Sequence, residues 1–456
     1  MAPSLLFSLL AACACPDGLA DRHGPGIQPG DSAPPDSGPT DTAGGDTGDS
    51  GGGAPGSFPA RYPADRLQSP ITPWVRDRLV ALRDGAPGLH DDVFMKVGDS
   101  ITVDDNALGC FAGSRVDLGE RSDLQPTITH FLEGQAGSGT LWDRDSLAAE
   151  IGQTAAWALS GSPAPVEQEL DALSPAFAVV QYGTNDIHMG STYLSAIQPF
   201  GESMLDLTDL LLDQGVIPLL VTIPPRADSA AVDAWVPTYN AVVRGIAQGR
   251  QVPLVDLELG LRPLDGYGLY GDGVHLEPWS QGACELTEQG LEYGCNMRNL
   301  LVLDGLDRLR RAALDGETFD EDGESLAGSG LAADPFVIDG LPFTDLRDTS
   351  LEGVRDIDSY PGCGSSADES GPELFYTFEL SARRTIRALV FDRGEVDIDL
   401  HLLGEGLAGE DCLLRDDSDL ETTLDAGRYH LVLDSYVSSG RELSGEYLLV
   451  LQTVEG

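Results

Sequence analysis

A serine follows an apolar run and a glycine at Ser100, where a strand over 93–97 would end. A serine in such a position can act as a nucleophile if a base takes its proton and donors meet the negative charge that develops. His275 fits the base, and among the seven histidines it alone has an acidic residue three positions earlier, Asp272. That carboxylate could bond one ring nitrogen and leave the other facing Ser100. These residue types predict nucleophilic catalysis by a serine.

Asn185 lies in the turn 183–186, directly after a second apolar run over 176–182. The run predicts a buried strand. In open α/β sheets, ligands bind beyond the carboxyl ends of the strands, and Ser100 and Asn185 would both lie at such ends. Asparagine is also common in ordinary turns, where its side chain bonds nearby backbone amides. The position after a strand favours the interpretation of Asn185 as a donor to the reacting oxygen.

The order of these segments resembles the SGNH, or GDSL-type, hydrolase family. The tripeptide Gly-Asp-Ser at 98–100 matches the nucleophile block of the family, 183–186 its asparagine block, and Asp272 with His275 its closing Asp-x-x-His block. The resemblance implies that Ser100 is the nucleophile, His275 the base and Asp272 the carboxylate that orients the base. An isolated Asp-x-x-His would be interpreted as a turn with a surface histidine, but the order of the blocks favours the catalytic interpretation.

The remaining block of the family supplies a glycine whose amide helps to bind the oxyanion. The segment 134–140 is similar to that block, which makes Gly137 the corresponding residue. The resemblance therefore implies three oxyanion donors, namely the Ser100 amide, the Gly137 amide and the Asn185 side chain.

The tripeptide Gly-Asp-Ser also occurs at 30–32 and 48–50. Both copies lie in a tract over 16–60 that is rich in Gly, Ser, Thr, Asp and Pro and has no flanking apolar strand. Such a tract cannot bury enough apolar surface to offset its ordering entropy. We therefore expect a disordered linker there and no scaffold for a nucleophile.

Strand and helix patterns alternate from residue 61 to residue 315, and the family resemblance covers about 90–315. After 93–97, the predicted strands are 176–182, 216–223 and 252–257, and the predicted helices are 200–213, 231–248 and 297–314. This alternation predicts an α/β fold with a mostly parallel sheet that is covered by helices on both faces. The resemblance implies the same flavodoxin-like three-layer α/β/α fold.

An acidic, glycine-rich segment over 316–334 is expected to be a linker. Short alternating runs separated by turns fill residues 335–456 and predict an antiparallel β-sandwich. Residues 397–402 and 426–431 resemble the bacterial pre-peptidase C-terminal type of module. Aspartates of this module could hold calcium. Solvated acidic faces on alternating strands are the favoured interpretation, and we predict no metal site and no cofactor.

The amino terminus is expected to be an export signal over residues 1–15. Residues 5–12 are apolar and too few to span a bilayer as a mature helix. The segment 10–13 resembles a lipobox, which would make Cys13 the acylated first residue of a lipoprotein anchored outside the cytoplasm. One feature disagrees, because export signals begin with positive charge and the first basic residue here is Arg22.

The chain of 456 residues has a formal net charge of -48, and Lys96 is its only lysine. Such acidity opposes binding to nucleic acid and to anionic membrane surfaces, so contact with a membrane is expected only through a lipid anchor. Setting the acylated cysteine aside, six cysteines remain, and no Cys-x-x-Cys favours a zinc cluster. The economical disulfides are Cys363 with Cys412 and Cys284 with Cys295.

The sequence thus predicts an exported serine esterase that hydrolyses acyl esters through an acyl-Ser100 intermediate. Acylated carbohydrates or small esters are the expected substrates. Two alternatives stay open. The protein could be a surface-binding lipoprotein whose α/β domain has lost activity, or an O-acyltransferase that passes the same acyl group to a sugar hydroxyl.

Overall fold

The computed structural model describes residues 58–137, 139–320, 323 and 325–454. The predicted export signal, the predicted acylation at Cys13 and all but the last three residues of the predicted linker over 16–60 lie outside the described residues. In the described part of the chain, no helix is both long enough and apolar enough to cross a membrane.

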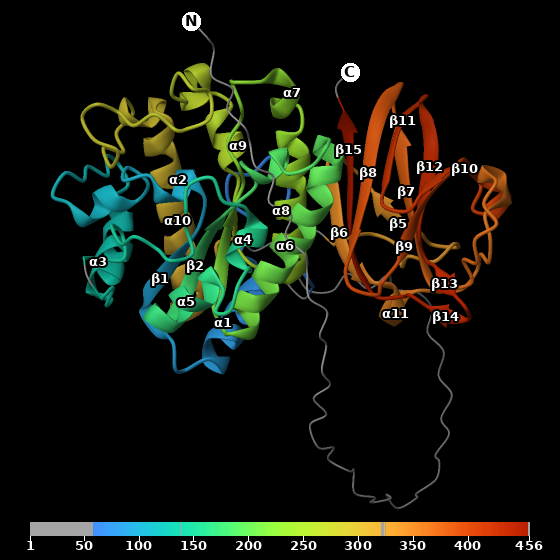
Figure 1. The fold of residues 1–456 in the computed structure, drawn as a ribbon, viewed down its shortest axis with the longest axis horizontal. Coiled ribbons are helices and arrows are strands. Elements are labelled where there is room, and N and C mark those ends of the chain that lie inside the picture. Colours follow the sequence, from blue (N-terminus) through green and yellow to red (C-terminus); the bar gives the residue numbers. More distant parts are fainter. Residues whose placement is uncertain (1–57, 138, 321–322, 324, 455–456) are drawn as a thin grey trace, which may run out of the picture. The chain divides into compact units, whose positions relative to one another are not determined.

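A parallel sheet forms the centre of the first region (Figure 1). Its strands lie in the order β1-β2-β3-β4, and their bounds are β1 (His90–Gly98), β2 (Pro175–Gln181), β3 (Ile217–Val221) and β4 (Leu254–Val255). All residues of β2 and β3 are buried, as expected for strands of a parallel sheet that is covered on both faces. On the outer side of β1, the segment 146–150 lies beside the end of the strand and forms one parallel bridge, between Gly98 and Ala149.

Two groups of helices cover this sheet. One group consists of α1 (Pro73–Gly85), α3 (Gln125–Glu133) and α10 (Gly294–Asp315), which contact one another and the sheet. The other group consists of α4 (Ala155–Ala158), α5 (Pro165–Leu173), α6 (Tyr193–Asp213) and α8 (Val236–Arg250). The predicted α/β fold with its mostly parallel sheet is therefore confirmed.

Some element boundaries differ from the predicted ones for local reasons. The predicted helix over 231–248 is two helices, α7 (Ala230–Asp233) and α8, because a proline stands in the first turn of α8 and prolines begin helices more readily than they continue them. The strand β4 is shorter than predicted because Asp256 caps the following helix α9 (Leu257–Leu261).

The second region consists of two sheets that enclose one apolar core. The five-stranded sheet has the order β10-β9-β12-β7-β5, and the four-stranded sheet has the order β11-β8-β15-β6. All pairings are antiparallel except that of β5 with β7. The predicted antiparallel β-rich fold is thus confirmed. The bounds are β5 (Phe336–Ile338), β6 (Phe343–Asp348), β7 (Glu373–Leu380), β8 (Arg384–Asp392), β9 (Ile398–Leu403), β10 (Cys412–Asp416), β11 (Asp419–Leu424), β12 (Gly427–Ser435) and β15 (Glu446–Val454). A short hairpin of β13 (Val437–Ser438) and β14 (Arg441–Glu442) completes the region.

The segment 353–372 connects the short helix α11 (Thr349–Glu352) to β7 and lies against the outer face of the five-stranded sheet. A small apolar cluster joins this segment to the sheet, with Tyr360 from the segment, Phe375 from β7 and Val432 from β12. The segment therefore covers side chains that alternation alone would assign to solvent.

Two disulfides are present among the described cysteines. The predicted bond between Cys363 and Cys412 is confirmed. The predicted bond between Cys284 and Cys295 is wrong, because Cys284 bonds to Cys110. The segment that carries Cys284 pairs with Asp117 and so lies beside the chain that follows the nucleophile. Cys295 is buried and its thiol donates to the Leu276 carbonyl at 3.1 Å.

Candidate active site

The structure brings the three predicted triad residues together at the carboxyl end of β1. Ser100 is the first residue of the short helix α2 (Ser100–Val103). The His275 Nε2 atom lies 2.9 Å from the Ser100 Oγ atom, and the His275 Nδ1 atom lies 2.7 Å from Asp272 Oδ2. This line of hydrogen bonds from a carboxylate through an imidazole to a hydroxyl is the arrangement that activates a serine.

Each residue of the tripeptide before α2 has a separate task. Gly98 leaves no room for a side chain, since a Cβ there would lie 2.1 Å from Thr102 Oγ1 and 2.7 Å from the Gln181 carbonyl oxygen. Asp99 is buried, and its Oδ1 accepts a hydrogen bond from the Ile101 amide at 2.9 Å, which caps α2. The strand therefore turns tightly into the helix and presents Ser100 at its first position.

A tight turn presents His275 to the nucleophile. The Oδ1 atom of Asp272 accepts hydrogen bonds from the amides of Val274 at 3.0 Å and His275 at 3.1 Å, which leaves Oδ2 for the imidazole. Gly273 has a φ of +72°, and a Cβ there would lie 2.4 Å from the Asp228 amide nitrogen. Partial burial opposes ionisation of Asp272, but the two amides and the His275 ring outweigh it and lower the pKa of the carboxyl to about 2. The carboxylate is therefore ionised at any ordinary pH.

Asn185 lies at the end of β2 and points to the neighbouring segment, where its Nδ2 donates to the Gln153 carbonyl at 2.9 Å. The aspartate after it fixes the turn, because Asp186 accepts hydrogen bonds from the Ala155 amide and the Gly183 amide, both at 3.0 Å. Burial raises the pKa of Asp186 to about 7. Asn185 thus has one amide hydrogen engaged and a second one free to meet a ligand.

The structure does not bring Gly137 to Ser100. The preceding Gly134 packs against the carbonyl of Asp92, near the start of β1, and a Cβ on Gly137 would lie 3.8 Å from the Arg144 side chain. The prediction that the Gly137 amide is an oxyanion donor therefore needs correction, since the nucleophile lies at the opposite end of the strand.

Gly152, in contrast to Gly137, follows a segment that runs beside the carboxyl end of β1. The segment before it follows β1, with the Gly98 amide donating to Ala148 and the Glu150 amide donating to Gly98. Gly152 comes two residues later and directly before Gln153, the acceptor of Asn185. It has a φ of +79° and open space on its Cβ side. The signal in the sequence was the short apolar run 147–149 followed by Gly152-Gln153-Thr154, which resembles a strand that ends in a turn.

A second feature that sequence reasoning missed is a buried arginine below the site. Arg298 on α10 is 1% exposed, and its Nε donates to Gln181 Oε1 at 2.9 Å. Its charge favours ionisation of Asp99, but burial outweighs this effect and raises the pKa of the Asp99 carboxyl to about 6. Arg298 lies in no motif block, so only the tertiary structure identifies it.

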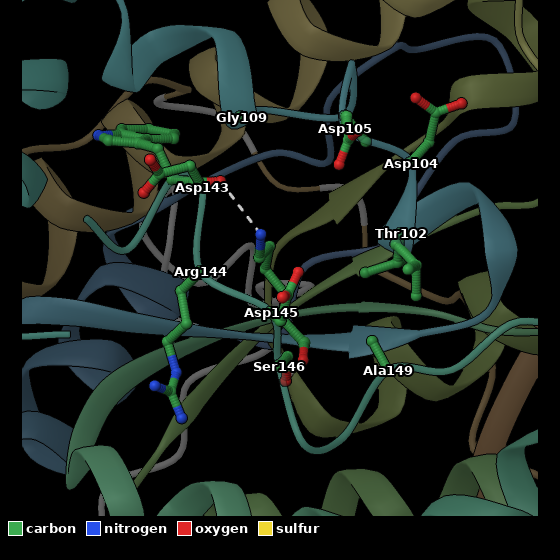
Figure 2. A pocket seen from close by; sticks show the side chains of 13 residues that line it. Thr102, Asp104, Asp105, Gly109, Asp143, Arg144, Asp145, Ser146 and Ala149 are labelled. Atoms are coloured by element: carbon green, nitrogen blue, oxygen red, sulfur yellow. Dashed lines mark hydrogen bonds between the residues drawn. The ribbon is translucent and has the colours of Figure 1, made fainter. Parts of the chain in front are cut away.

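A polar cavity of about 290 Å³ lies beside α2. Figure 2 shows Asp104 and Asp105 on one side of this cavity and Asp143 and Arg144 on the other. Lys96 also lines it and donates from Nζ to the Trp142 carbonyl at 3.1 Å. Burial lowers the pKa of the Lys96 ammonium to about 8. The cavity next to α2 thus offers several carboxylate acceptors and one ammonium group, that of Lys96, which loses its proton more easily than an exposed lysine does.

Exposed apolar side chains occur on the segments that carry the candidate residues. Ile151 is 70% exposed and precedes Gly152, Met189 is 68% exposed and follows Asn185 by four residues, and Tyr270 is 41% exposed. The Tyr270 amide donates to the His275 carbonyl. These side chains provide exposed apolar surface on the segments that carry the candidate residues.

Comparison with protein families identifies the central part of the chain. Residues 97–280 match the GDSL-like lipase/acylhydrolase family, and this range includes Ser100, Asn185, Asp272 and His275. The chain therefore contains a GDSL-like acylhydrolase domain, and the resemblance inferred from its blocks is confirmed. A comparison with curated proteins gave no match.

Solved structures that are similar to parts of this chain include an esterase, a lipase and a domain of a collagenase. An acetylxylan esterase from Geobacillus stearothermophilus shares 15% identity, covers 47% of this chain and 93% of its own, and has a TM-score of 0.31. A GDSL-like lipase from Bacteroides thetaiotaomicron shares 15% identity over 51% of this chain and 98% of its own, with a TM-score of 0.31. A pre-peptidase C-terminal domain of a collagenase from Bacillus anthracis shares 16% identity over 25% of this chain and 92% of its own, with a TM-score of 0.18.

Proposed function

We propose that this protein is a serine esterase that removes acyl groups from oxygen esters through a covalent acyl-Ser100 intermediate. The observation that carries the proposal is the line of hydrogen bonds from Asp272 through His275 to Ser100. Binding to a surface does not require three side chains from two distant segments to be held in proton-transfer geometry, whereas ester hydrolysis does.

In the first half of the reaction, His275 Nε2 takes the proton of Ser100 as Oγ attacks the ester carbonyl carbon. The negative charge on the carbonyl oxygen is met by the amides of Ser100 and Gly152 and by Asn185 Nδ2. The tetrahedral intermediate then collapses, the bond to the alcohol breaks, and the alcohol leaves with the proton held by His275. Asp272 remains ionised and stabilises the imidazolium.

In the second half, water replaces the alcohol. His275 takes a proton from water, the hydroxide attacks the acyl carbon, and the bond to Ser100 breaks as the serine recovers its proton. An O-acyltransferase would use a sugar hydroxyl at this step. The side chains of His275 and Asp272 are 39% and 50% exposed, so water reaches the acyl-enzyme freely, and this favours hydrolysis.

An acylated carbohydrate or a small ester is the proposed substrate. The cavity beside α2 supports an alcohol portion with several hydroxyl groups, because its aspartates can accept hydrogen bonds from them. The exposed Ile151 and Met189 could contact the methyl or short alkyl part of an acyl group.

Export of the protein, with a lipid anchor at Cys13, is also part of the proposal. Two disulfides in the described residues support an oxidising compartment. The test is the mass of the amino-terminal peptide from membranes of expressing cells. A diacylglycerol modification that disappears in Cys13→Ser supports the anchor, and an unmodified peptide starting at the initiator contradicts it.

The proposed activity is tested with p-nitrophenyl esters of two to eight acyl carbons and with acetylated xylose. We expect turnover by the wild type and a fall of roughly 10³-fold or more in Ser100→Ala. The matched control is Ser50→Ala, which changes the same tripeptide in the predicted linker and should leave the rate unchanged. Equal rates for the wild type and Ser100→Ala would refute the assignment.

A further inference from the structure

Strand register places a row of acidic residues on the outer face of the five-stranded sheet. Asp399 of β9 lies opposite Asp434 of β12, and Asp434 in turn lies opposite Glu373 of β7. Their neighbours in sequence alternate into the apolar core, as Leu400 and Leu433 do. Like charges directly opposite each other on neighbouring strands repel, so this row needs a compensating positive charge.

The covering segment 353–372 adds a further carboxylate to the row and removes it from water. Glu369 of this segment and Asp434 are 0% exposed, and Asp399 is 2% exposed. The interpretation of these strand aspartates as solvated is therefore wrong for Asp399, because the sequence does not reveal that a loop covers this face.

His401 lies within the same buried cluster. It precedes Leu402 of the core and is 0% exposed, and its Nε2 atom lies 3.8 Å from Glu369 Oε1. Glu369, His401 and Asp434 each offer one possible metal-ligand atom, and these three atoms all lie within 4.8 Å of one another. A ring of Tyr360 stacks on the imidazole with centroids 3.5 Å apart, and its hydroxyl donates to Asp434 Oδ2 at 2.6 Å.

Several polar atoms of this cluster have no hydrogen-bond partner. Both ring nitrogens of His401, Oε2 of Glu369 and Oδ1 of Asp434 are unpartnered although all three side chains are fully buried. A buried polar atom without a partner costs about 1–3 kcal/mol, and more when the group is charged. Native proteins rarely keep so many in one place unless something binds them.

Among the described residues, Arg415 is the one arginine that forms ion pairs with this cluster. Arg415 of β10 approaches Asp399 Oδ2 at 2.6 Å and Glu369 Oε1 at 3.3 Å. Asp434 has no cationic partner, and Glu373 accepts only from the amides of Asp356 and Ile357. Full ionisation of the four carboxyl groups would leave excess negative charge beside one guanidinium, and burial makes that charge costly unless a cation offsets it.

We propose that this cluster is a metal site in which Glu369, His401 and Asp434 bind one divalent transition-metal ion of the zinc type. Two carboxylate oxygens and one imidazole nitrogen are a donor set that suits such an ion, and the histidine nitrogen disfavours calcium or magnesium, which take oxygen ligands. The ion would supply positive charge to the buried carboxylates and a partner for one ring nitrogen of His401. Tyr360 orients two of the ligands, through the stacked His401 ring and the bond to Asp434.

The site would fasten the covering segment to the sheet. Glu369 comes from that segment, His401 from β9 and Asp434 from β12, and the disulfide from Cys363 to Cys412 joins the same segment to β10. The metal is therefore structural, and its binding stabilises the β-rich region.

The test measures metal content and thermal stability of the full chain. The purified protein is dialysed against a chelator and then incubated separately with Zn²⁺, Ca²⁺ or Mg²⁺. After incubation with Zn²⁺, we expect inductively coupled plasma mass spectrometry to find about one zinc per chain. Calorimetry should show a higher midpoint temperature of unfolding with Zn²⁺ and no such rise with Ca²⁺ or Mg²⁺. In Glu369→Gln and His401→Gln, both the stoichiometric zinc and the shift should be lost. Glu369→Gln preserves the volume of the side chain, so it reports on the site even if the histidine variant folds poorly.

The matched control is His430→Gln. His430, on β12, is also a buried histidine and its Nδ1 has no partner, but it does not belong to the cluster. This variant should bind zinc as the wild type does. Absence of stoichiometric zinc and of any zinc-dependent shift in the wild type would overturn the proposal. A stabilisation by Ca²⁺ that survives in His401→Gln would also overturn it, and would transfer the cation to Asp397, Asp399 and Asp417.

Discussion

In the α/β region, Asp272 and His275 keep 50% and 39% of their side-chain surface exposed, and hydrogen bonds join them to each other and to Ser100. In the β-rich region, Glu369 and His401 are fully buried, and atoms of both have no partner. The first arrangement suits proton transfer to a substrate that arrives from water. The second leaves buried atoms that a ligand could satisfy, so ionisable residues near each other can serve different purposes according to burial and pairing.

The largest effect on catalysis is expected when His275, which links Asp272 to Ser100 by hydrogen bonds, is replaced. His275→Gln should lower kcat for ester hydrolysis by about 10⁴-fold or more, because the serine loses its base. His130→Gln is the control, since His130 lies on α3 and bonds only the Asp91 carbonyl. Steady-state kinetics on a p-nitrophenyl ester measures both. A loss below about tenfold in His275→Gln would remove the histidine from the mechanism.

A smaller effect should distinguish the two glycines. Gly152 and Gly137 have nearly the same left-handed φ, +79° and +77°, so an alanine strains the backbone equally at both sites. Gly152→Ala should displace the proposed oxyanion amide and lower kcat by roughly 10- to 100-fold. Gly137→Ala should leave kcat unchanged. If Gly137→Ala has the larger effect on kcat, the correction of the oxyanion donor is wrong.

Stability should depend on pH through Asp99. Its pKa is raised from an ordinary value near 4 to about 6, so between these values the folded state binds more protons than the unfolded state. The free energy of unfolding therefore rises as the pH falls from about 6 to about 4, by at most about 3 kcal/mol. Asp99→Asn keeps an oxygen to accept from Ile101 and should lack this rise. Denaturant titrations at pH 4 and pH 7 compare the two proteins, and equal slopes with pH would contradict the burial argument.

The smallest effect compares one disulfide of each region. The bond from Cys110 to Cys284 spans 174 residues, and the bond from Cys363 to Cys412 spans 49. Loop-closure entropy predicts that replacing the first pair by serines destabilises the protein by about 1 kcal/mol more than replacing the second. Denaturant titrations of the two double variants test this, and the reverse order would show that native-state strain outweighs chain entropy.

The sequence predicted the residues that directly follow strongly apolar strands. Ser100 follows the end of β1 by two residues and Asn185 follows the end of β2 by four, and His275 is tied to Asp272 by a turn of four residues. Such local patterns define a position without knowledge of the rest of the fold. Gly152 was missed because the segment before it makes a single bridge to β1 and its apolar run is only three residues long, 147–149.

The remaining features depend on contacts between distant parts of the chain. Cys284 was paired with the wrong cysteine because nearness in sequence says little about which loop packs beside it. Arg298 and the cluster around His401 show no motif, and the alternation of β9 indicates two faces without indicating that a segment covers one of them. Burial of this kind follows from the tertiary fold alone.

The scarcity of lysine affects the stability of the protein at high pH. Apart from Lys96, all its side-chain cations above neutral pH are arginines, and in the described residues every ion pair that does not involve histidine uses a guanidinium. Ammonium groups discharge near pH 10, whereas guanidinium groups keep their charge beyond about pH 12. The ion pairs of this protein should therefore persist to a higher pH than those of a lysine-rich protein. Circular dichroism measured up to pH 11 tests this, and loss of secondary structure near pH 10 would contradict it.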